Sequence, residues 1–472
     1  SLQKGWTIEG DYKIPSDLQY ADIRRWRRLV GMKQILVMMA VVVLGQSLAA
    51  DKKLLIADPI VEKAVRRVLQ KPEGELTVAD LEKVTSLRLP FRQIPDVGLK
   101  EVAKLQNLKE LTLYDTKITD AGLKEVAKLQ NLTILTLART QITDAGLKDV
   151  AKLQNLRWLN LSQTQISDVG LKEVAKLQKL ELLYLDRTQI TDAGSRKCPV
   201  AEARSALVEW HANHDAGLKE VAQLQNLRAL FLSGTQITDA GIKEVAKLQQ
   251  LEWLKLFRTQ ITDAGLKEVA QLQNLGDLDL ANTQITDAGL KEVAKLQELE
   301  SLVLGGTQIT DAGLKEVAKL QNLEELLLPR QITDAGLKEV AKLQQLIRLN
   351  LDFSKITDVG LKEVAKLQNL ENLGLPATKI TDAGLKDVAK LQKLESLYLR
   401  STKITDAGLK EVAKLQKLER LYLAGSKITD AGLKELAKLH KLERLYLYGT
   451  QVTKAGLAEL KKALPNCEIR SP

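Results

Sequence analysis

A unit of 24 residues recurs from about Val84 to the C-terminus, and this period constrains the fold more than any other feature. Its consensus is LxxLxLxxTxITDAGLKEVAKLQN, and residues 131–144 read NLTILTLARTQITD. A fixed period of this length is typical of a solenoid, in which each repeat packs only on its neighbours. The Asp after the ITD turn falls at Asp96, Asp120, Asp144, Asp168, Asp192, Asp239, Asp263, Asp287 and Asp311.

The LxxLxL part of the unit alternates apolar and variable positions, which predicts a short strand with one buried face. In the copy around residue 134 we expect Leu135 and Leu137 to point inward. We expect Ile134, Thr136 and Ala138 to point outward.

The second half of the unit predicts a helix. Asp144 is the expected N-cap of a helix over residues 147–153. Leu147, Val150, Ala151 and Leu153 form its apolar stripe. One strand and one helix cannot bury these faces alone, but stacked copies can. The predicted fold is therefore a right-handed α/β solenoid shaped as a horseshoe, with a parallel sheet on its concave face and helices on its convex face.

This pattern resembles the leucine-rich-repeat family from about residue 80 to 469. The TDAGL continuation resembles a long-repeat subclass found in bacterial secreted proteins of planctomycete type. The Asn that usually follows the strand is replaced by Thr116, Thr140, Thr164 and Thr188.

The N-terminal residues do not follow the repeat. Met32-Lys33, the apolar run 35–44 and the small residues before Asp51 predict a signal peptide over 32–49, cleaved after Ala49. Residues 1–31 are then interpreted as a non-native upstream extension, disordered or loosely helical; the alternative is a cytoplasmic tail with a short anchor. The run is too short for a membrane-spanning helix, so the expected location is secreted or periplasmic, with no stable membrane span after cleavage.

Both ends of a solenoid need caps, because a terminal repeat exposes its apolar flank. Residues 50–83 predict a helical N-terminal cap, and residues 55–89 resemble the caps of bacterial internalin-like proteins. At the other end, residues 456–464 predict a last helix and residues 465–469 a closing half-strand. The resulting order is the N-terminal cap, repeats over 84–194, a degenerate unit over 195–214, repeats over 215–454 and a C-terminal cap over 455–472.

The degenerate unit contains Cys198, Trp210, His211 and His214, residue types that suggest a metal or nucleophile site. We interpret it instead as a frameshift scar, because a repeat-like KLQKLEALWLSGTQIT coding sequence read from its third base gives VAEARSALVEWHANH, identical to residues 200–214. A loop or distorted coil is expected here. At residues 328–331 the Thr position is missing, and a tighter turn should absorb the loss.

No motif in the chain predicts catalysis, a cofactor or a metal site, so an enzyme is not expected. Cys198 and Cys467 are far apart in the array, and His440 should be exposed. The net charge of +10 does not predict nucleic-acid binding, because each helix alternates Lys with Glu or Asp. The turn Asp residues lack the clustered oxygen ligands that calcium requires.

Aromatic residues of the array occupy outward strand positions or the position just after them, whereas the helix half of the unit hardly varies. Exposed Tyr, Trp and Arg dominate interface hot spots, so the concave face is predicted to bind a protein. Binding of a glycan and a purely structural envelope role are the alternatives. The predicted contact residues are Tyr398, Tyr422, Tyr446, Tyr448, Arg400, Arg420 and Arg444, followed by Trp158, Tyr184, Trp253 and Phe257.

Overall fold

The structure is a computed structural model that describes residues 56–89, 94–191 and 217–471. The chain divides into two compact units, Ser1–Lys52 and Lys53–Pro472, and only the second contains described residues. The predicted extension over 1–31, the signal peptide over 32–49 and the degenerate unit over 195–214 lie outside the described residues. Among the described helices, none has the length and apolarity that a membrane crossing requires.

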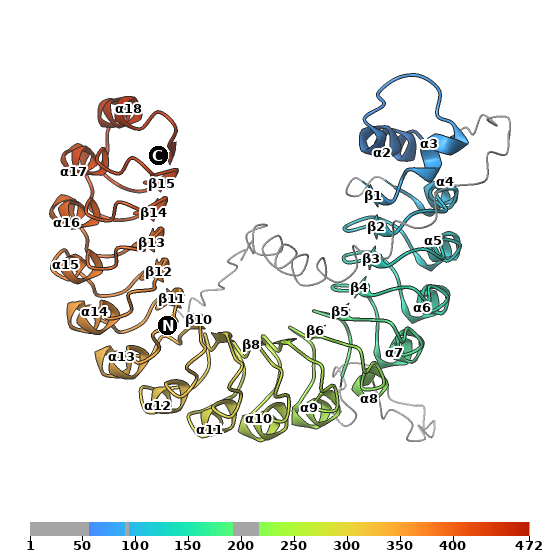
Figure 1. The fold of residues 1–472 in the computed structure, drawn as a ribbon, viewed down its shortest axis with the longest axis horizontal. Coiled ribbons are helices and arrows are strands. Elements are labelled where there is room, and N and C mark those ends of the chain that lie inside the picture. The colour runs from blue at the N-terminus through green and yellow to red at the C-terminus, as the bar shows by residue number, and fades with distance from the viewer. Residues whose placement is uncertain (1–55, 90–93, 192–216, 472) are drawn as a thin grey trace, which may run out of the picture. The chain divides into compact units, whose positions relative to one another are not determined.

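The second unit contains one sheet of sixteen parallel strands, arranged in chain order (Figure 1). Each strand has three residues and pairs with the strands of the coils before and after it, where a coil is one strand, its turn and its helix. This confirms the predicted leucine-rich-repeat solenoid. The strands are β1 Ser86–Arg88, β2 Glu110–Thr112, β3 Ile134–Thr136, β4 Trp158–Asn160, β5 Leu182–Tyr184, β6 Ala229–Phe231, β7 Trp253–Lys255, β8 Asp277–Asp279, β9 Ser301–Val303, β10 Glu325–Leu327, β11 Arg348–Asn350, β12 Asn372–Gly374, β13 Ser396–Tyr398, β14 Arg420–Tyr422, β15 Arg444–Tyr446 and β16 Glu468–Arg470.

Short helices follow the strands and cover the outer side of this unit, while the strands line its inner side (Figure 1). We call these two sides the helix face and the strand face. The helices are α2 Pro59–Leu69, α3 Val78–Glu82, the 3-10 helix η1 Asp96–Gly98, α4 Leu99–Val102, α5 Asp120–Val126, α6 Asp144–Val150, α7 Asp168–Val174, α8 Gly217–Val221, α9 Asp239–Val245, α10 Asp263–Val269, α11 Leu290–Val293, α12 Leu314–Val317, α13 Asp334–Val340, α14 Asp358–Val364, α15 Leu385–Val388, α16 Asp406–Val412, α17 Asp430–Leu436 and α18 Lys454–Ala463.

The strand of one coil shows how the repeat buries its core. Leu135 and Leu137 are fully buried, as predicted, while Ile134 and Thr136 are partly exposed on the strand face. The prediction for Ala138 is wrong, because this residue is 3% exposed. The strand ends at Thr136, and the chain has already begun to turn at Ala138, so the alternation of sides no longer holds there.

A turn follows each strand and depends on the Thr that replaces the usual Asn. Arg139 has a φ of 57°, in the left-handed region, and the buried Thr140 donates its hydroxyl to the carbonyl of Leu137 at 2.6 Å. The hydroxyl satisfies a buried carbonyl that the strand ladder leaves free. The same bond recurs in most coils, so Thr can close this turn without the longer Asn side chain.

The recurring Asp is not the helix N-cap, and that prediction is wrong. Helix α6 begins at Asp144, and the hydroxyl of Thr143 caps it by accepting from the N–H of Ala145. The Asp144 carboxylate instead accepts from the N–H of Ser167 at 2.8 Å and from its hydroxyl at 2.5 Å. Each Asp thus fixes the cap residue of the following coil.

This inter-coil bond also explains the Gly of the Asp-Ala-Gly sequence. A Cβ atom on Gly146 would collide with the carboxylate of Asp120, which belongs to the preceding coil. Only a residue without a side chain lets the Asp reach the next Thr. The helix face is therefore a ladder of Asp–Thr bonds that joins neighbouring coils.

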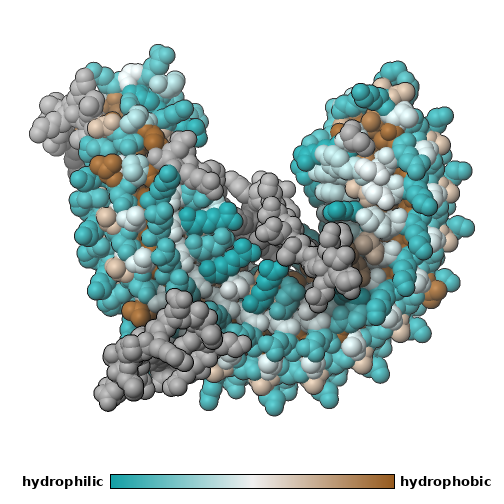
Figure 2. Space-filling model, turned by 180° about the vertical axis from the view of Figure 1, so that it is seen from behind, coloured by the Kyte–Doolittle hydropathy of each residue, from teal (hydrophilic) through white to brown (hydrophobic). Residues whose placement is uncertain are grey.

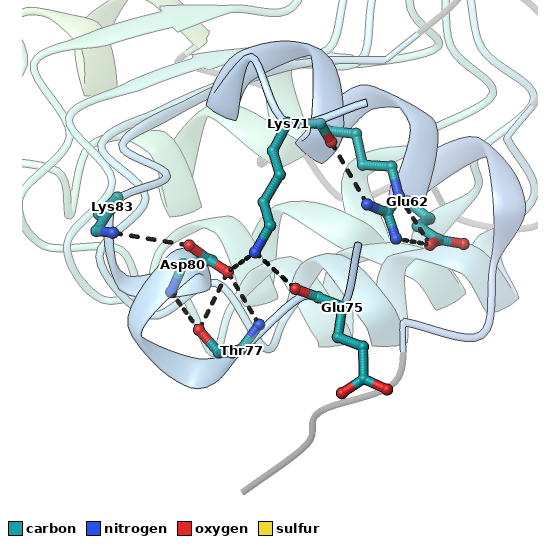
Figure 3. A network of polar contacts seen from close by, with 7 residues as sticks. Glu62, Lys71, Glu75, Thr77, Asp80 and Lys83 are labelled. Carbon is teal, nitrogen blue, oxygen red and sulfur yellow. Dashed lines mark hydrogen bonds and ion pairs between the residues drawn. The ribbon is translucent and has the colours of Figure 1, made fainter. Parts of the chain in front are cut away.

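The N-terminal cap closes one end of the array. Helix α2 buries Val61 and Val65 against the first coil, while Val68 is exposed. Figure 3 shows the bonds that hold α2 and α3 together: Lys71 Nζ lies 2.8 Å from Asp80 Oδ2, and Thr77 and Asp80 form a capping box. These bonds, led by the one from Lys71, hold the pKa of Asp80 well below its usual range.

At the C-terminal end the structure contains both predicted elements. Helix α18 is capped by Thr453, and β16 pairs with β15 as the last strand of the sheet. Residues 465 and 466 form the turn between them, so the half-strand begins at Glu468 rather than at Pro465.

The sheet is continuous between β5 and β6, the strands before and after the degenerate unit. Strand β5 pairs directly with β6, which places Tyr184 opposite Phe231, 47 residues later in the sequence. Thr143 precedes Gly146 by three residues, whereas the equivalent Thr191 precedes Gly217 by 26. The array therefore carries the extra 23 residues as an insertion at the entry to α8.

The coil with the missing residue also keeps its register. Glu325 pairs with Arg348 23 residues on, while Thr333 still donates to Asp311. The left-handed turn residue of the other coils has no counterpart here, and Gln331 donates to the carbonyls of Thr307 and Ile309 instead. The tighter turn is confirmed.

Candidate binding surface on the strand face

Three tyrosines form a continuous stack on the strand face. The register places Tyr398 opposite Tyr422 and Tyr422 opposite Tyr446, so the predicted column is present. Ring centroids are 4.3 Å apart in both pairs, with interplanar angles of 12° and 9°. Burial, and then the neighbouring phenols, raise the pKa of Tyr422 far above its usual value. The stack therefore presents neutral hydroxyls and ring edges to solvent.

Arginines occupy the column beside this stack, as predicted. Arg420 lies between Ser396 and Arg444 in the register. Its Nη1 donates to the hydroxyl of the buried Ser396 at 3.3 Å, and its Nη2 lies 3.8 Å from Glu419. Arg400 and Tyr448 are exposed just beyond the strands β13 and β15. The predicted first set of residues thus gathers on three adjacent coils, those of β13, β14 and β15.

A second aromatic stack lies on the N-terminal half of the array. Trp158 stacks on Tyr184 with centroids 5.8 Å apart, and Tyr184 stacks on Phe231 at 3.9 Å with an interplanar angle of 7°. The sequence places Phe231 in an outward strand position near these residues, but it was not among the predicted contact residues. Direct pairing of β5 and β6 creates this contact.

The other two predicted residues of that half do not share the column of Tyr184 and Phe231. Trp253 is in register with Ala229 and Asp277. Phe257 follows its strand and lies under the guanidinium of Arg258, 5.0 Å from the ring centroid. The second predicted set is therefore one stack plus two separate positions.

Acidic residues on the strand side were not among the predicted contact residues: Asp277 and Asp279 lie on β8, between the two stacks, and Asp186 follows β5. Asp277 pairs with Lys255 at 2.6 Å. Burial raises the pKa of Asp279 and of Asp186, and the positive charge of Lys255 only partly opposes this at Asp279. The sequence could have predicted this acidic pair, since Asp277 and Asp279 are both outward positions of one strand.

The strand side of the described coils also collects unsatisfied polar atoms. Four buried side-chain atoms in the described residues have no hydrogen-bond partner: Trp158 Nε1, Asp352 Oδ1, Ser354 Oγ and Arg420 Nε. All four belong to strands or to the turns directly after them. Such atoms are uncommon in native proteins, and a water molecule or a small rotation of the side chain can supply the partner.

The rest of the described surface shows few further features of a binding site. On the side seen in Figure 2, hydrophobic residues form small separate spots on a hydrophilic surface. No three His, Cys, Asp or Glu residues within 56–89, 94–191 and 217–471 are placed to hold a metal ion. Cys467 is buried, which raises its pKa to about 11, and His440 is exposed.

Comparison with known proteins agrees with this geometry. Family models described as leucine-rich repeat region or leucine-rich repeat match residues 202–361, 130–190, 390–413 and 414–437. The chain is a leucine-rich-repeat protein. Members of this family typically serve as non-catalytic binding scaffolds. No curated protein matches the sequence.

Solved structures of bacterial leucine-rich-repeat proteins are similar to this one. The Leptospira interrogans protein LIC12759 is 26% identical, with a TM-score of 0.50, and the match covers 83% of this chain and 97% of that one. An internalin, InlF of Listeria monocytogenes, is 24% identical with a TM-score of 0.47, over 82% of this chain and 94% of that one. The match to the Leptospira interrogans protein agrees with the leucine-rich-repeat fold of this chain.

Proposed function

We propose that this leucine-rich-repeat protein is a non-catalytic binding module whose strand face captures a protein partner. The observation that carries the proposal is the stack of Tyr398, Tyr422 and Tyr446 beside Arg420 and Arg444. Tyr and Arg are the residue types that supply most hot spots of protein interfaces. They are gathered on the side of the array that varies from coil to coil.

The geometry of the stack favours a protein over a glycan. Sugars pack their C–H groups on the faces of aromatic rings, but at 4.3 Å the tyrosines cover each other's inner faces. Apart from the outer face of Tyr398, ring edges and hydroxyls remain, and the hydroxyls can hydrogen-bond to peptide groups. A purely structural role accounts for the stacking, which contributes about 0.5–1.5 kcal/mol a pair, but not for the exposed Arg400 and Tyr448 beside it.

We propose that the protein acts in the cell envelope, secreted or periplasmic, after signal cleavage, as a member of the planctomycete-type subclass. Nucleic acid is not the proposed partner, because the helix face mixes Lys with acidic residues, and the second Lys of most LKEVAK segments is paired with the acid three residues before it. Lys128 with Glu125 at 2.7 Å and Lys342 with Glu339 at 2.6 Å are two of these i, i+3 pairs. A mixed face of this kind has no basic stripe to follow a phosphate backbone.

A crosslinking pull-down from the native cell envelope tests the proposal. The bait is the chain starting at Ala50. It is compared with a Tyr422→Ser/Tyr446→Ser variant and with a Lys410→Ser/Lys434→Ser control on the helix face of the coils of Tyr398 and Tyr422. A protein captured by the first and third baits but not by the second supports the proposal. Equal capture by all three contradicts it, and binding only of envelope glycan supports the alternative.

A further inference from the structure

The tyrosine stack has two ends, and the C-terminal end is complete. The guanidinium of Arg470 lies over the ring of Tyr446, 5.4 Å from its centroid. Glu468 holds this guanidinium, accepting from its Nε and Nη2 at 2.8 Å each. An aromatic face, a guanidinium and a carboxylate thus come together there.

At the other end of the stack the guanidinium is missing. The register places Gly374, which has no side chain, opposite Tyr398. Among the described residues, the ring contact of Tyr398 is with Tyr422, on the opposite side. No guanidinium of the described residues lies over Tyr398, although other aromatic rings of the array have one.

A carboxylate is nevertheless present beside this ring position. A Cβ atom on Gly374 would lie 2.9 Å from Asp352 Oδ1 and 3.3 Å from Asn350 Cγ, so both side chains reach over the glycine. Asp352 follows the strand β11, two coils before Tyr398. A carboxylate thus lies beside the column at this end too, two residues after the column position Asn350, whereas Glu468 lies two residues before the column position Arg470.

This carboxylate lacks a cation. Asp352 Oδ1 has no hydrogen-bond partner, and among the described contacts the residue forms no ion pair with Arg400 or any other cation. Its own N–H donates to Asn350 at 2.8 Å. Burial raises the pKa of Asp352 to about 6, and the Asn350 side chain only partly opposes this. Oδ1 itself is buried, whereas the residue as a whole is partly exposed, so a ligand approaches the carboxylate from its exposed side.

We propose that this end of the stack binds an arginine side chain of the protein partner, its guanidinium lying on the free face of Tyr398 and donating to Asp352. The inference rests on the proposed function, since it gives the chemistry of the partner at the same surface. Guanidinium is favoured over ammonium because its planar fork can stack and donate at once. The chain itself uses this pairing at Arg139 with Tyr114 and at Arg330 with Phe353.

Nuclear magnetic resonance of the chain with labelled tyrosine rings tests the inference directly. The chain has eight tyrosines, and Tyr398→Phe assigns the signal of interest. The probe is N-acetyl-arginine methylamide, with the lysine and glutamine analogues as controls. The expected result is a saturable shift of the Tyr398 signal with the arginine probe that exceeds the shift with either analogue.

Two variants at the site and one nearby sharpen the test. Asp352→Asn should weaken binding of the probe at least about tenfold, as expected for the loss of a charge-assisted hydrogen bond. Gly374→Ala should weaken it as well, because the new Cβ displaces the carboxylate. Glu395→Gln, which removes a carboxylate elsewhere on the coil of Tyr398, should leave binding unchanged.

The outcomes separate this inference from the proposed function. An unchanged Tyr398 signal, or equal binding to the Asp352→Asn variant, overturns the arginine site. A partner whose capture needs Tyr422 and Tyr446 but not Asp352 overturns the arginine site while supporting the proposed function. Saturable arginine binding without any captured protein supports the site and counts against the proposed function.

Discussion

The pKa values of carboxylates are shifted in opposite directions on the helix face and on the strand face of this array. On the helix face, Asp430 accepts from Thr453 and Glu435 from Lys438, and these bonds lower the pKa of both acids. On the strand face, burial raises the pKa of Asp279 and Asp352. The first arrangement stabilises the coil, and the second costs stability. Groups that cost stability can be retained where they bind something, which supports the binding role proposed for the strand face.

The largest effect should follow from breaking the helix-face ladder. Asp287 accepts from the N–H and the hydroxyl of Thr310 at 2.8 and 2.6 Å. We expect Asp287→Ala to lower the free energy of unfolding by about 3 kcal/mol, since bonds to charged groups contribute roughly 1.5–3 kcal/mol each. Urea unfolding measures this. Asp287→Asn keeps one acceptor and should lose less; a neutral Asp287→Ala variant would contradict the ladder.

Removal of a ring from the middle of the stack should affect binding more than folding. Tyr422→Ser is expected to weaken binding of the partner by about 2 kcal/mol or more, as for an interface hot spot. It should lower stability by about 1–2 kcal/mol, because two stacking contacts are lost. Titration with the captured partner and thermal unfolding measure the two effects. A large loss of stability with unchanged affinity would make the stack structural.

A change of pH should distinguish the two faces through Asp352. Its folded pKa of about 6 lies above the ordinary value of 3.8, so the folded state binds more protons between these values. The contribution of Asp352 to stability is therefore present below pH 4 and is lost as the pH rises to about 6. Partial exposure reduces this loss to about 1 kcal/mol.

Unfolding of wild type and Asp352→Asn across pH 4 to 7 measures this contribution. As the pH rises, the free energy of unfolding of Asp352→Asn should increase relative to that of the wild type. A difference that stays constant with pH would show that the carboxylate is not buried as the structure has it.

The smallest effect is expected from the exposed ion pairs of the helix face. Lys342 Nζ lies 2.6 Å from Glu339, but the lysine side chain is 60% exposed. Lys342→Ala should change stability by no more than about 0.5 kcal/mol, because solvent screens such pairs. A loss above about 1 kcal/mol in thermal unfolding would contradict this, and the variant also serves as a control for Asp287→Ala.

The repeat made most of the fold predictable. Its period fixed the inward Leu135 and Leu137, the parallel strands and the column of Tyr398, Tyr422 and Tyr446. The role of Asp144 was mistaken because its partner Ser167 lies 23 residues away, in the next coil, and only stacked coils bring the two together. A capping rule that considers only neighbouring residues in the sequence cannot predict a contact between two coils.

The candidate site was predictable in part, for the same reason. The regular spacing of the repeats made the tyrosine column recognisable in the sequence. The insertion, in contrast, displaced Phe231 from its apparent alignment with Tyr184. The orphaned Asp352 was not predictable, since its significance depends on Gly374 in the next coil and Tyr398 in the one after. Whether a side chain lacks a partner is decided by packing across several coils.

Site-specific photocrosslinking tests the central claim most directly. A benzophenone amino acid would replace Tyr448, which is 50% exposed on the strand side, or Lys438, whose side chain is 62% exposed on the helix face. The account predicts that a partner is crosslinked from position 448 and not from position 438. Crosslinking from position 438 alone would place the partner on the helix face and contradict it.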